Sequence, residues 1–272
     1  MEPHQYATLL DDVIRIAHEA GQAILDVYSR QAFCVDQKDD GSPVTEADMA
    51  AHDAVVKGLK ELTPDWPVLS EEGELPSFDE RKQWQRYWLV DPLDGTREFI
   101  RHNGEFTVNI ALIEQGVSVL GVIQVPVSGV CFYAQKGQDA YVDVPGKSAE
   151  RISVRLWNGE KITVACSSRT RHMSVFKRFL EMFQGYELVT LGSSLKSCYV
   201  AQGRADIYAR FGPTAEWDTA AAQCIVEAAG GALVDIASMQ PLRYNSKDSI
   251  LNPSFMTFGD VSHDWCAFLP KE

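Results

Sequence analysis

The stretch Trp88-Leu89-Val90-Asp91-Pro92-Leu93-Asp94-Gly95-Thr96 joins an apolar run to two carboxylates. The run from Tyr87 to Val90 predicts a buried strand, which leaves Asp91 and Asp94 at its C-terminal end, just before a glycine turn. Acids placed there repel each other and lose hydration, and a hard divalent cation between them removes both penalties. The stretch therefore predicts a metal site, and an ordinary acidic turn is the alternative that it leaves open.

Size and charge limit the kind of partner that this chain can bind. Its 272 residues, 45% of them hydrophobic, suffice for one large core or two closely joined halves. The formal net charge of -13 disfavours nucleic acid polymers and anionic lipid as partners. An anionic substrate would need a local reversal of sign, which a metal held by carboxylates would supply.

Cysteine usage and the apolar runs indicate the compartment. None of the six cysteines forms a CxxC pair, so zinc and thioredoxin-type chemistry are not expected. The first residues lack the basic and apolar regions of a secretion signal, and no apolar stretch approaches 18 residues. We expect a cytoplasmic protein without an integral membrane segment. Peripheral attachment to the inner face of the cytoplasmic membrane and the oligomeric state are left open.

Hydrophobic periodicity divides the chain into two patterns. Helices are predicted up to about Tyr28 and from Thr45 to Pro64, the second opened by a capping box of Thr45 and Asp48. A short strand at 68–69 precedes the segment quoted above. Closely spaced strands follow it and predict an antiparallel meander, at residues 106–113, 117–125, 129–134 and 139–142.

The second half alternates strands with helices, which predicts a smaller mixed layer. The expected strands are 161–165, 187–191, 206–209 and 233–234, and the expected helices are 173–183, 194–202 and 218–229. Gly230-Gly231 fits the C-cap of the last helix. The whole is therefore predicted to be an α/β protein in two halves, residues 1–158 and 159–272.

Three further acids stand at the ends of predicted elements, as Asp91 and Asp94 do. Asp48 opens a helix, Glu71 follows a short strand, and Asp218 lies where the last helix is expected to begin. Each has a structural alternative, because Asp48 and Asp218 suit helix N-termini and Glu71 suits a loop.

These motifs together resemble the inositol monophosphatase superfamily of metal-dependent phosphatases. The resemblance rests on segments 43–48, 71–72, 91–96 and 217–221, in the right order over nearly the whole chain. Segments 88–113, 192–196 and 210–214 resemble its 3′(2′),5′-bisphosphate nucleotidase branch more closely. The implied fold is a layered αβαβα sandwich of the sugar-phosphatase type, with an antiparallel sheet in the N-terminal half and a smaller mixed sheet in the C-terminal half.

The resemblance also implies a set of site residues. Glu71, Asp91 and the Leu93 carbonyl would hold one Mg²⁺, and Asp91, Asp94 and Asp218 a second, with a third ion joining when substrate is bound. Asp48 and Thr96 would be catalytic, orienting and deprotonating a metal-bound water for in-line attack. The implied substrate contacts are Glu71, Leu93, Asp94, Gly95, Thr96, Ser193, Lys196, Arg210 and Asp218.

The implied activity is hydrolysis of adenosine 3′,5′-bisphosphate to AMP and phosphate, with lithium inhibition and a role in sulfur metabolism. The sulfated analogue is a second candidate substrate. Lys196 and Arg210 would bind the second phosphate, while a solvated helix residue and a surface residue are their alternatives. Two other hypotheses stay open: an inositol monophosphatase or related sugar phosphatase, and a metal- or nucleotide-sensing protein without turnover.

Overall fold

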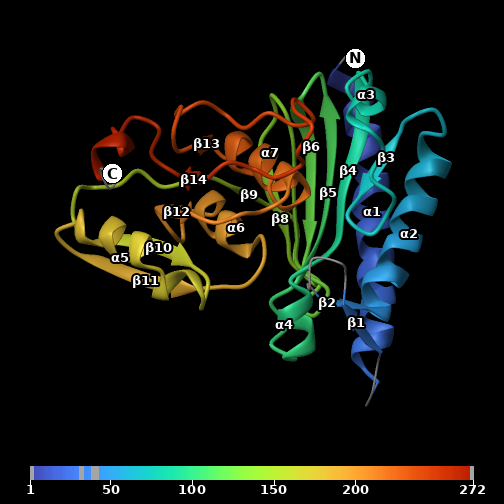
Figure 1. Cartoon of the computed structure of the whole chain (residues 1–272), viewed down its shortest axis with the longest axis horizontal. Helices are drawn as coiled ribbons and strands as arrows, with labels where there is room; N and C mark the ends of the chain where they lie inside the picture. The colour runs from blue at the N-terminus through green and yellow to red at the C-terminus, as the bar shows by residue number, and fades with distance from the viewer. Residues whose placement is uncertain (1–2, 31–33, 38–42, 270–272) are drawn as a thin grey trace.

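A seven-stranded sheet forms the centre of the N-terminal half. The computed structural model describes residues 3–30, 34–37 and 43–269 (Figure 1). The N-terminal segment, which is not expected to be a secretion signal, includes residues 1–2. These two residues lie outside the described residues. The strand order is β3-β4-β5-β6-β7-β8-β9, with β3 parallel to β4 and every other pair antiparallel. The strands are β3 (Val68–Ser70), β4 (Arg86–Asp94), β5 (Thr107–Glu114), β6 (Val117–Gln124), β7 (Cys131–Gln135), β8 (Ala140–Asp143) and β9 (Glu150–Ile152).

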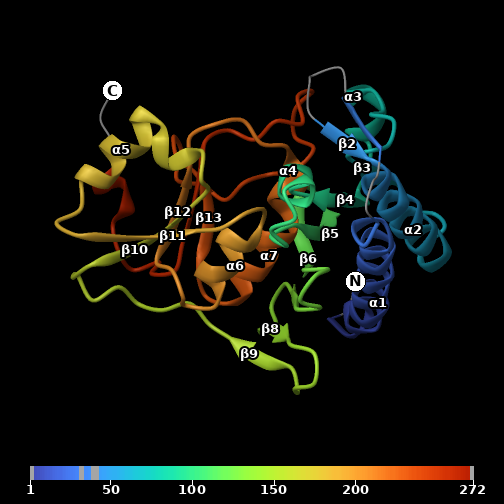
Figure 2. The ribbon, with the colours of Figure 1, turned by 90° about the horizontal axis from the view of Figure 1, so that it is seen from below.

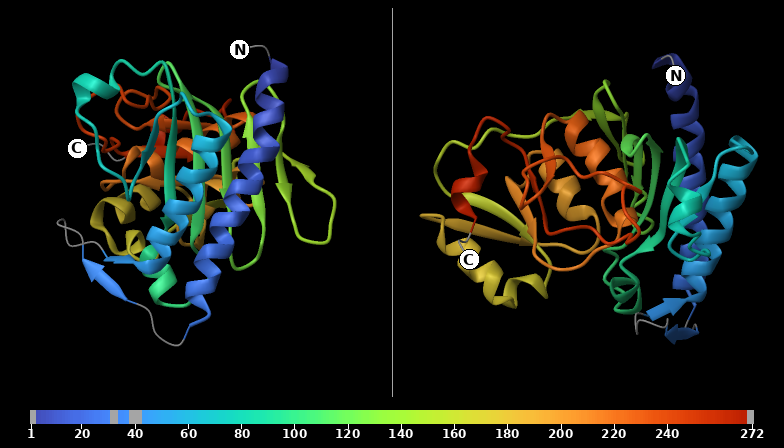
Figure 3. Two further views of the ribbon diagram at one scale, coloured as in Figure 1. Left: turned by 90° about the vertical axis from the view of Figure 1, so that its right-hand side faces the viewer. Right: turned by 45° about the horizontal axis from the view of Figure 1, so that its top comes forward.

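This sheet confirms the predicted meander and adds one strand to it. The unpredicted strand, β9, has two exposed residues followed by the buried Ile152, so its sequence carries almost no alternating pattern. Two helices, α1 (Pro3–Tyr28) and α2 (Glu46–Leu62), pack against one face of the sheet (Figure 3). Their apolar stripes form a core with Trp88, Val90 and Leu112 from the strands.

The opposite face of the sheet is covered by α6 (Leu195–Ala201) and α7 (Ala220–Ala228) (Figure 1). Close approach depends on Gly121 of β6, since a Cβ there would lie 2.4 Å from the Ala221 carbonyl oxygen. The end of α7 confirms its predicted cap. Gly230 has a φ of +95°, and the N–H groups of Gly230 and Gly231 donate to the carbonyls of Glu227 and Val226 at 3.1 and 2.9 Å.

A five-stranded mixed sheet packs on the other side of α6 and α7. Its order is β11-β10-β12-β14-β13, with parallel pairs around β10 and antiparallel pairs around β14. The strands are β10 (Ile162–Cys166), β11 (Tyr186–Thr190), β12 (Ile207–Arg210), β13 (Ala232–Asp235) and β14 (Phe255–Phe258). Its far face packs against α5 (Ser174–Glu181) through Phe176 and Phe179, which completes the expected αβαβα layering.

Short elements complete the chain. Strands β1 (Val35–Gln37) and β2 (Pro43–Thr45) pair antiparallel before α2, and Figure 2 shows β2 from below. The short helices are α3 (Phe78–Arg81), α4 (Thr96–Ile100), and the 3-10 turns η1 (Thr170–His172), η2 (Glu216–Asp218) and η3 (Trp265–Phe268). Among the residues described, none of the helices combines the length and apolar character needed to cross a bilayer.

Two predicted boundaries were wrong. The strand expected to stop at Val90 continues to Asp94, because β4 still pairs with β5 at Asp91 and Asp94, with the ladder shifted between them. The last helix begins at Ala220 rather than Asp218, since residues 216–218 form η2. Strand β14 is a third difference, because four residues without an alternating pattern gave no signal. The division at residue 158 stays a prediction.

Candidate active site

The irregular end of β4 places Asp91 and Asp94 at one cleft. Asp91 is 1% exposed, and its Oδ1 accepts the N–H of Leu93 at 3.1 Å. Asp91 pairs with Asn109 across the ladder, and Asp94 pairs with Thr107. The shift of register between these two pairs turns successive carboxylates toward the same opening, which a regular ladder would not do for residues three apart.

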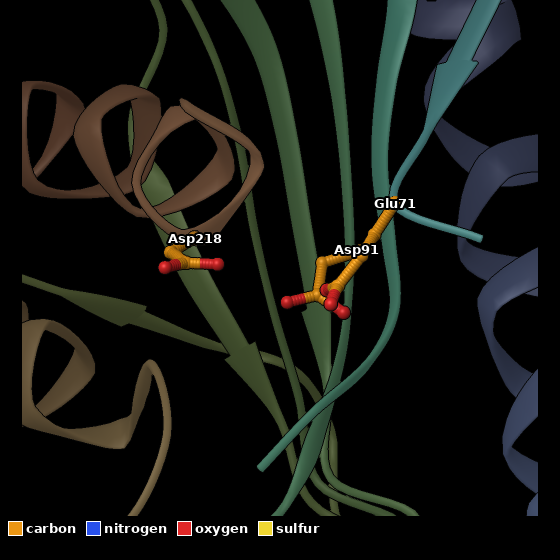
Figure 4. A group of neighbouring side chains, drawn as sticks. All are labelled: Glu71, Asp91 and Asp218. Atoms are coloured by element: carbon orange, nitrogen blue, oxygen red, sulfur yellow. The ribbon is translucent and has the colours of Figure 1, made fainter. Parts of the chain in front are cut away.

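Three carboxylates from separate elements meet beside this bulge. Glu71 directly follows β3, where its N–H donates to the Val90 carbonyl at 3.1 Å. Asp218 ends η2, and its Oδ2 accepts the Ala215 N–H at 3.0 Å. One carboxylate oxygen each from Glu71, Asp91 and Asp218 lies within 4.8 Å of the other two. Figure 4 shows Glu71 and Asp91 converging, with Asp218 facing them from the helix side.

The electrostatics of this group favour a cation. Burial raises the pKa of Asp91 well above its usual range, and the charges of Glu71 and Asp94 raise it further. Burial likewise raises the pKa of Asp218, followed by the charges of Asp94 and Glu71. Hard oxygen donors in this number suit Mg²⁺, which relieves the repulsion by binding the charged forms. The residues therefore fit the predicted metal.

Asp94 lies beside this group and is held by the second half of the chain. Its Oδ2 accepts the hydroxyls of Ser193 at 2.7 Å and Ser194 at 2.9 Å. Ser193 has a φ of +51°, a conformation that non-glycine residues rarely adopt and that often marks a functional turn. Asp94 is thus close to the three-carboxylate group, although it is not one of the members brought within 4.8 Å. Its role as a metal ligand stays a prediction.

Two polar residues behind Asp94 were missed from sequence. Thr107 and Asn109 are buried on β5, where Thr107 Oγ1 lies 2.6 Å from Ser193 Oγ and Asn109 Nδ2 donates to Ser194 Oγ at 3.0 Å. Ser194 was also not among the expected site residues. The available signal was the spacing of Thr107 and Asn109, two polar residues two apart on one face of an otherwise apolar strand.

Asp48 serves both of the purposes considered for it. Its Oδ2 accepts the Thr45 N–H at 2.7 Å, which confirms the capping box of α2. Its Oδ1 accepts the Thr96 hydroxyl at 3.0 Å. Gly95, with a φ of +100°, occupies the N-cap of α4 in place of Thr96 and turns the chain so that Thr96 reaches Asp48. The structure therefore brings the predicted catalytic pair together.

A buried cation faces the acids across the cleft. Lys196 is 6% exposed, donates to the Ser193 carbonyl and lies 5.3 Å from the centre of the Tyr208 ring. Burial lowers the pKa of Lys196, and the Asp94 carboxylate opposes that change. Arg210 ends β12 and donates to the Pro213 carbonyl at 3.1 Å. Lys196 is therefore not the solvated helix residue of its alternative, whereas the half-buried Arg210 leaves its alternative, a surface residue, open.

The cleft between the two sheets measures about 710 Å³. Every predicted metal ligand and substrate contact lines it: Glu71, Asp91, Leu93, Asp94, Gly95, Thr96, Ser193, Lys196, Arg210 and Asp218. Asp48 lies behind Thr96. Of the polar segment 168–172, residues Ser168, Arg169 and Thr170 line the cleft. A cleft of this size suits a small phosphorylated molecule rather than a polymer.

A fold of five layers with a carboxylate cluster between its sheets defines a class of metal-dependent phosphatase. The chain belongs to the inositol monophosphatase family, whose model matches residues 6–263. It is 46% identical to the 3′(2′),5′-bisphosphate nucleotidase CysQ of Escherichia coli K12 over 91% of this chain and 98% of that one.

Solved structures agree with this assignment. CysQ from Bacteroides thetaiotaomicron, a bacterial member of the family, superposes with a TM-score of 0.80 at 38% identity, covering 93% of this chain and 97% of its own. An IMPase from Thermotoga maritima gives a TM-score of 0.77 at 26% identity, covering 96% of both chains.

Proposed function

We propose that this protein is a Mg²⁺-dependent phosphomonoesterase that hydrolyses adenosine 3′,5′-bisphosphate to AMP and phosphate. The observation that carries the proposal is the meeting of Glu71, Asp91 and Asp218 within 4.8 Å, opposite the buried Lys196 in one cleft. The name of the CysQ relatives, 3′(2′),5′-bisphosphate nucleotidase, supports the substrate class. The sulfated analogue is proposed as a second substrate, and the cytoplasm as the site of action.

The proposed metal ligands follow the geometry of the cleft. Glu71, Asp91 and the Leu93 carbonyl would hold one Mg²⁺, while Asp91, Asp94 and Asp218 would hold a second. When bound, such ions neutralise phosphate charge and lower the pKa of a coordinated water. The hydroxyls of Ser193 and Ser194 donate to the Asp94 carboxylate and fix its orientation for this role.

The proton would leave the attacking water through Thr96 and Asp48. Thr96 lines the cleft, and its Oγ1 donates to Asp48 Oδ1 at 3.0 Å, so this oxygen would accept a hydrogen bond from a water in the cleft. Asp48 is 1% exposed and does not line the cleft, so a proton would reach it through Thr96. This pair therefore orients the water and accepts its proton, a role that typically contributes about 10²- to 10⁴-fold to a rate.

Substrate choice would depend on the two cations of the second half. Lys196 acts as a buried point charge and Arg210 offers a planar fork, and together they suit a second phosphate group. An inositol or sugar monophosphate has no such group to place there. Ser168, Arg169 and Thr170 also line the cleft and would face the rest of the nucleotide.

Specificity constants test the substrate class. We expect kcat/KM for adenosine 3′,5′-bisphosphate to exceed those for inositol 1-phosphate and fructose 1,6-bisphosphate, with phosphate release dependent on Mg²⁺. A higher constant for inositol 1-phosphate would support the alternative, an inositol or sugar phosphatase. No phosphate release from any of the three would leave a binding protein without turnover.

Lys196→Ala tests how the bisphosphate is selected. The variant should lose at least about 10-fold in kcat/KM on the bisphosphate, since a charge-assisted phosphate contact contributes about 1.5–3 kcal/mol. AMP and inositol 1-phosphate should be affected much less. Lys161→Ala is the control, because Lys161 pairs with Glu187 on the surface outside the cleft. An equal loss on all substrates would refute the proposed role of Lys196.

A further inference from the structure

A second polar cluster lies behind the turn that carries Asp218. It consists of Arg81, Glu216 and Asn245, which we call the clamp. Arg81 is 1% exposed and Glu216 is 0% exposed, and no member of the clamp lines the cleft. Charged side chains are rarely buried so completely unless they are paired or functional.

The clamp holds the turn of Asp218 from outside. Glu216 Oε2 accepts the Asn245 N–H at 2.7 Å, and the Glu216 N–H donates to the Ile250 carbonyl at 2.9 Å. Asn252 Nδ2 donates to the Ala215 carbonyl at 2.6 Å. The segment 245–252 therefore fixes Ala215 and Glu216, and Ala215 is the residue whose N–H binds the Asp218 carboxylate.

Arg81 connects this segment to the other half of the site. Its Nη1 donates to Asn245 Oδ1 at 2.7 Å and to the Lys247 carbonyl at 3.2 Å. The guanidinium also donates to the Asp248 carbonyl, and Asn245 Nδ2 donates back to the carbonyl of Arg81. Because Arg81 ends α3, in the segment that continues from Glu71, one side chain links the regions that carry Glu71 and Asp218.

The clamp is a poor device for stability alone. Among the described residues, Arg81 Nε, Glu216 Oε1 and the nearby Tyr87 hydroxyl are buried without a hydrogen-bond partner. Lys247 Nζ lies 3.6 Å from Glu216 Oε1, which is too long for a good hydrogen bond. Burying charges with unsatisfied atoms costs free energy, and well-packed apolar groups would serve stability as well. A positional role explains why charged groups with rigid hydrogen bonds stand here.

We propose that Arg81 is a positioning residue that sets the affinity of the site for Mg²⁺. Acting through Asn245 and Glu216, it fixes the place of Asp218 relative to Glu71 and Asp91. The inference rests on the proposed function, in which these carboxylates bind the ion. It assigns metal affinity to residues that touch neither the ion nor the substrate.

Two variants separate position from charge. Arg81→Lys keeps the cation but removes the fork that reaches Asn245 and two carbonyls together. Asn245→Gly removes the side-chain link, yet glycine accepts the φ of 54° and keeps the N–H that binds Glu216. Mg²⁺ binding to the metal-free protein, measured by isothermal titration calorimetry without substrate, should weaken about 10-fold in Arg81→Lys and detectably in Asn245→Gly.

The Mg²⁺ concentration for half-maximal phosphate release should rise by the same factors, while KM for the nucleotide at saturating Mg²⁺ stays near the wild-type value. Arg155→Met is the matched control. It breaks a bidentate pair with Asp206, at 2.6 Å for both bonds, outside the cleft. It should lower Tm without changing Mg²⁺ affinity.

The outcomes are distinguishable. Wild-type Mg²⁺ affinity in both clamp variants overturns the inference alone, as does an equal loss of affinity in Arg155→Met, which would indicate general loosening. If Arg81→Lys does not fold, Asn245→Gly decides, because its backbone geometry is retained. A wild-type protein that binds no Mg²⁺ overturns the proposed function, and the inference with it.

Discussion

Asp48 uses its two carboxylate oxygens for different tasks. Oδ2 caps α2, and Oδ1 accepts the Thr96 hydroxyl. The cap fixes the carboxylate before any substrate arrives, so its orientation needs no reorganisation during the reaction. A residue that would pass for an ordinary helix cap in sequence can therefore also be part of the chemistry.

Thr96→Ala should lower kcat by about 10²-fold or more, because the water would lose the hydroxyl that orients it. Mg²⁺ affinity, measured by calorimetry, should change little, since Thr96 Oγ1 bonds to Asp48 rather than to the three-carboxylate group. Thr96→Ser keeps the hydroxyl and should restore most of the activity. Unchanged turnover in Thr96→Ala would reduce Thr96 to a structural residue of α4.

Asp94→Asn should abolish measurable phosphate release. The asparagine amide cannot supply a charged ligand. Its NH₂ group can also donate to the oxygens of Ser193 and Ser194, whose hydroxyls donate to Asp94 in the wild-type protein. Asp79→Asn is the control, because Asp79 is exposed and pairs with Lys82 on the surface. Near-normal turnover of Asp94→Asn across a Mg²⁺ titration would contradict its assignment as a ligand.

Local patterns were sufficient for two of the acids and for one cap, whereas the roles of Glu71 and Asp218 were implied only by the resemblance. Asp91, Asp94 and the capping box of Thr45 and Asp48 follow from neighbours within four residues. Thr107 and Asn109 were missed because their meaning depends on Ser193 and Ser194, more than eighty positions away along the chain. Sequence spacing alone contains no information about that contact.

At the scale of elements, β4 carries Asp91 and Asp94 of the site, and η2, just before α7, carries Asp218. The strand was predicted to end at Val90, since two acids and a proline rarely continue a ladder. It continues because the irregular pairing with β5 leaves Pro92 outside the regular register. Periodicity predicts which residues form a strand, but the shift in register depends on the partner strand.

Gly121→Ala tests how closely α7 must approach β6. The added methyl would lie 2.4 Å from the Ala221 carbonyl oxygen, so the helix must move. We expect a loss of about 1–3 kcal/mol in the free energy of unfolding, measured with denaturant. Mg²⁺ affinity should fall as well, because α7 follows directly from the turn of Asp218.

Gly185→Ala is the control for this substitution, since a Cβ there meets nothing within 4 Å. It should leave both stability and Mg²⁺ affinity near the wild-type values. Equal stability of Gly121→Ala and Gly185→Ala would show that the contact between α7 and β6 tolerates expansion.

At the scale of the whole molecule, the site exists only where the two halves meet. The order of the motifs and the two periodicities predicted both sheets. They could not predict that one apolar core would include strands of both sheets together with α6 and α7. That shared core holds Asp218 opposite Asp91, and it depends on packing between segments far apart in sequence.

Stability should depend on pH and Mg²⁺ together. In the metal-free protein the pKa values of Asp91 and Asp218 are raised from 3.8, mainly by burial. Below pH 3.8 both carboxyls are protonated in the native and the unfolded state, so this contribution to stability is fully present. As pH rises from there to the folded pKa, the unfolded state releases protons that the native state keeps, and the free energy of unfolding falls until the folded pKa is passed. Mg²⁺ binds the charged forms, so its increase in Tm should be larger at about pH 8 than at about pH 5. Differential scanning calorimetry with Mg²⁺ and with a chelator measures Tm in the two states. An equal increase in Tm at both pH values would contradict the proposed linkage.

The distribution of the three carboxylates along the chain also affects biosynthesis. Glu71 and Asp91 leave the ribosome long before Asp218, which occupies position 218 of 272. A nascent chain therefore has an incomplete set of donors until Asp218 has been synthesised. We expect metal loading to follow that point, and a polypeptide released before residue 218 to bind magnesium more weakly than the full set of donors does.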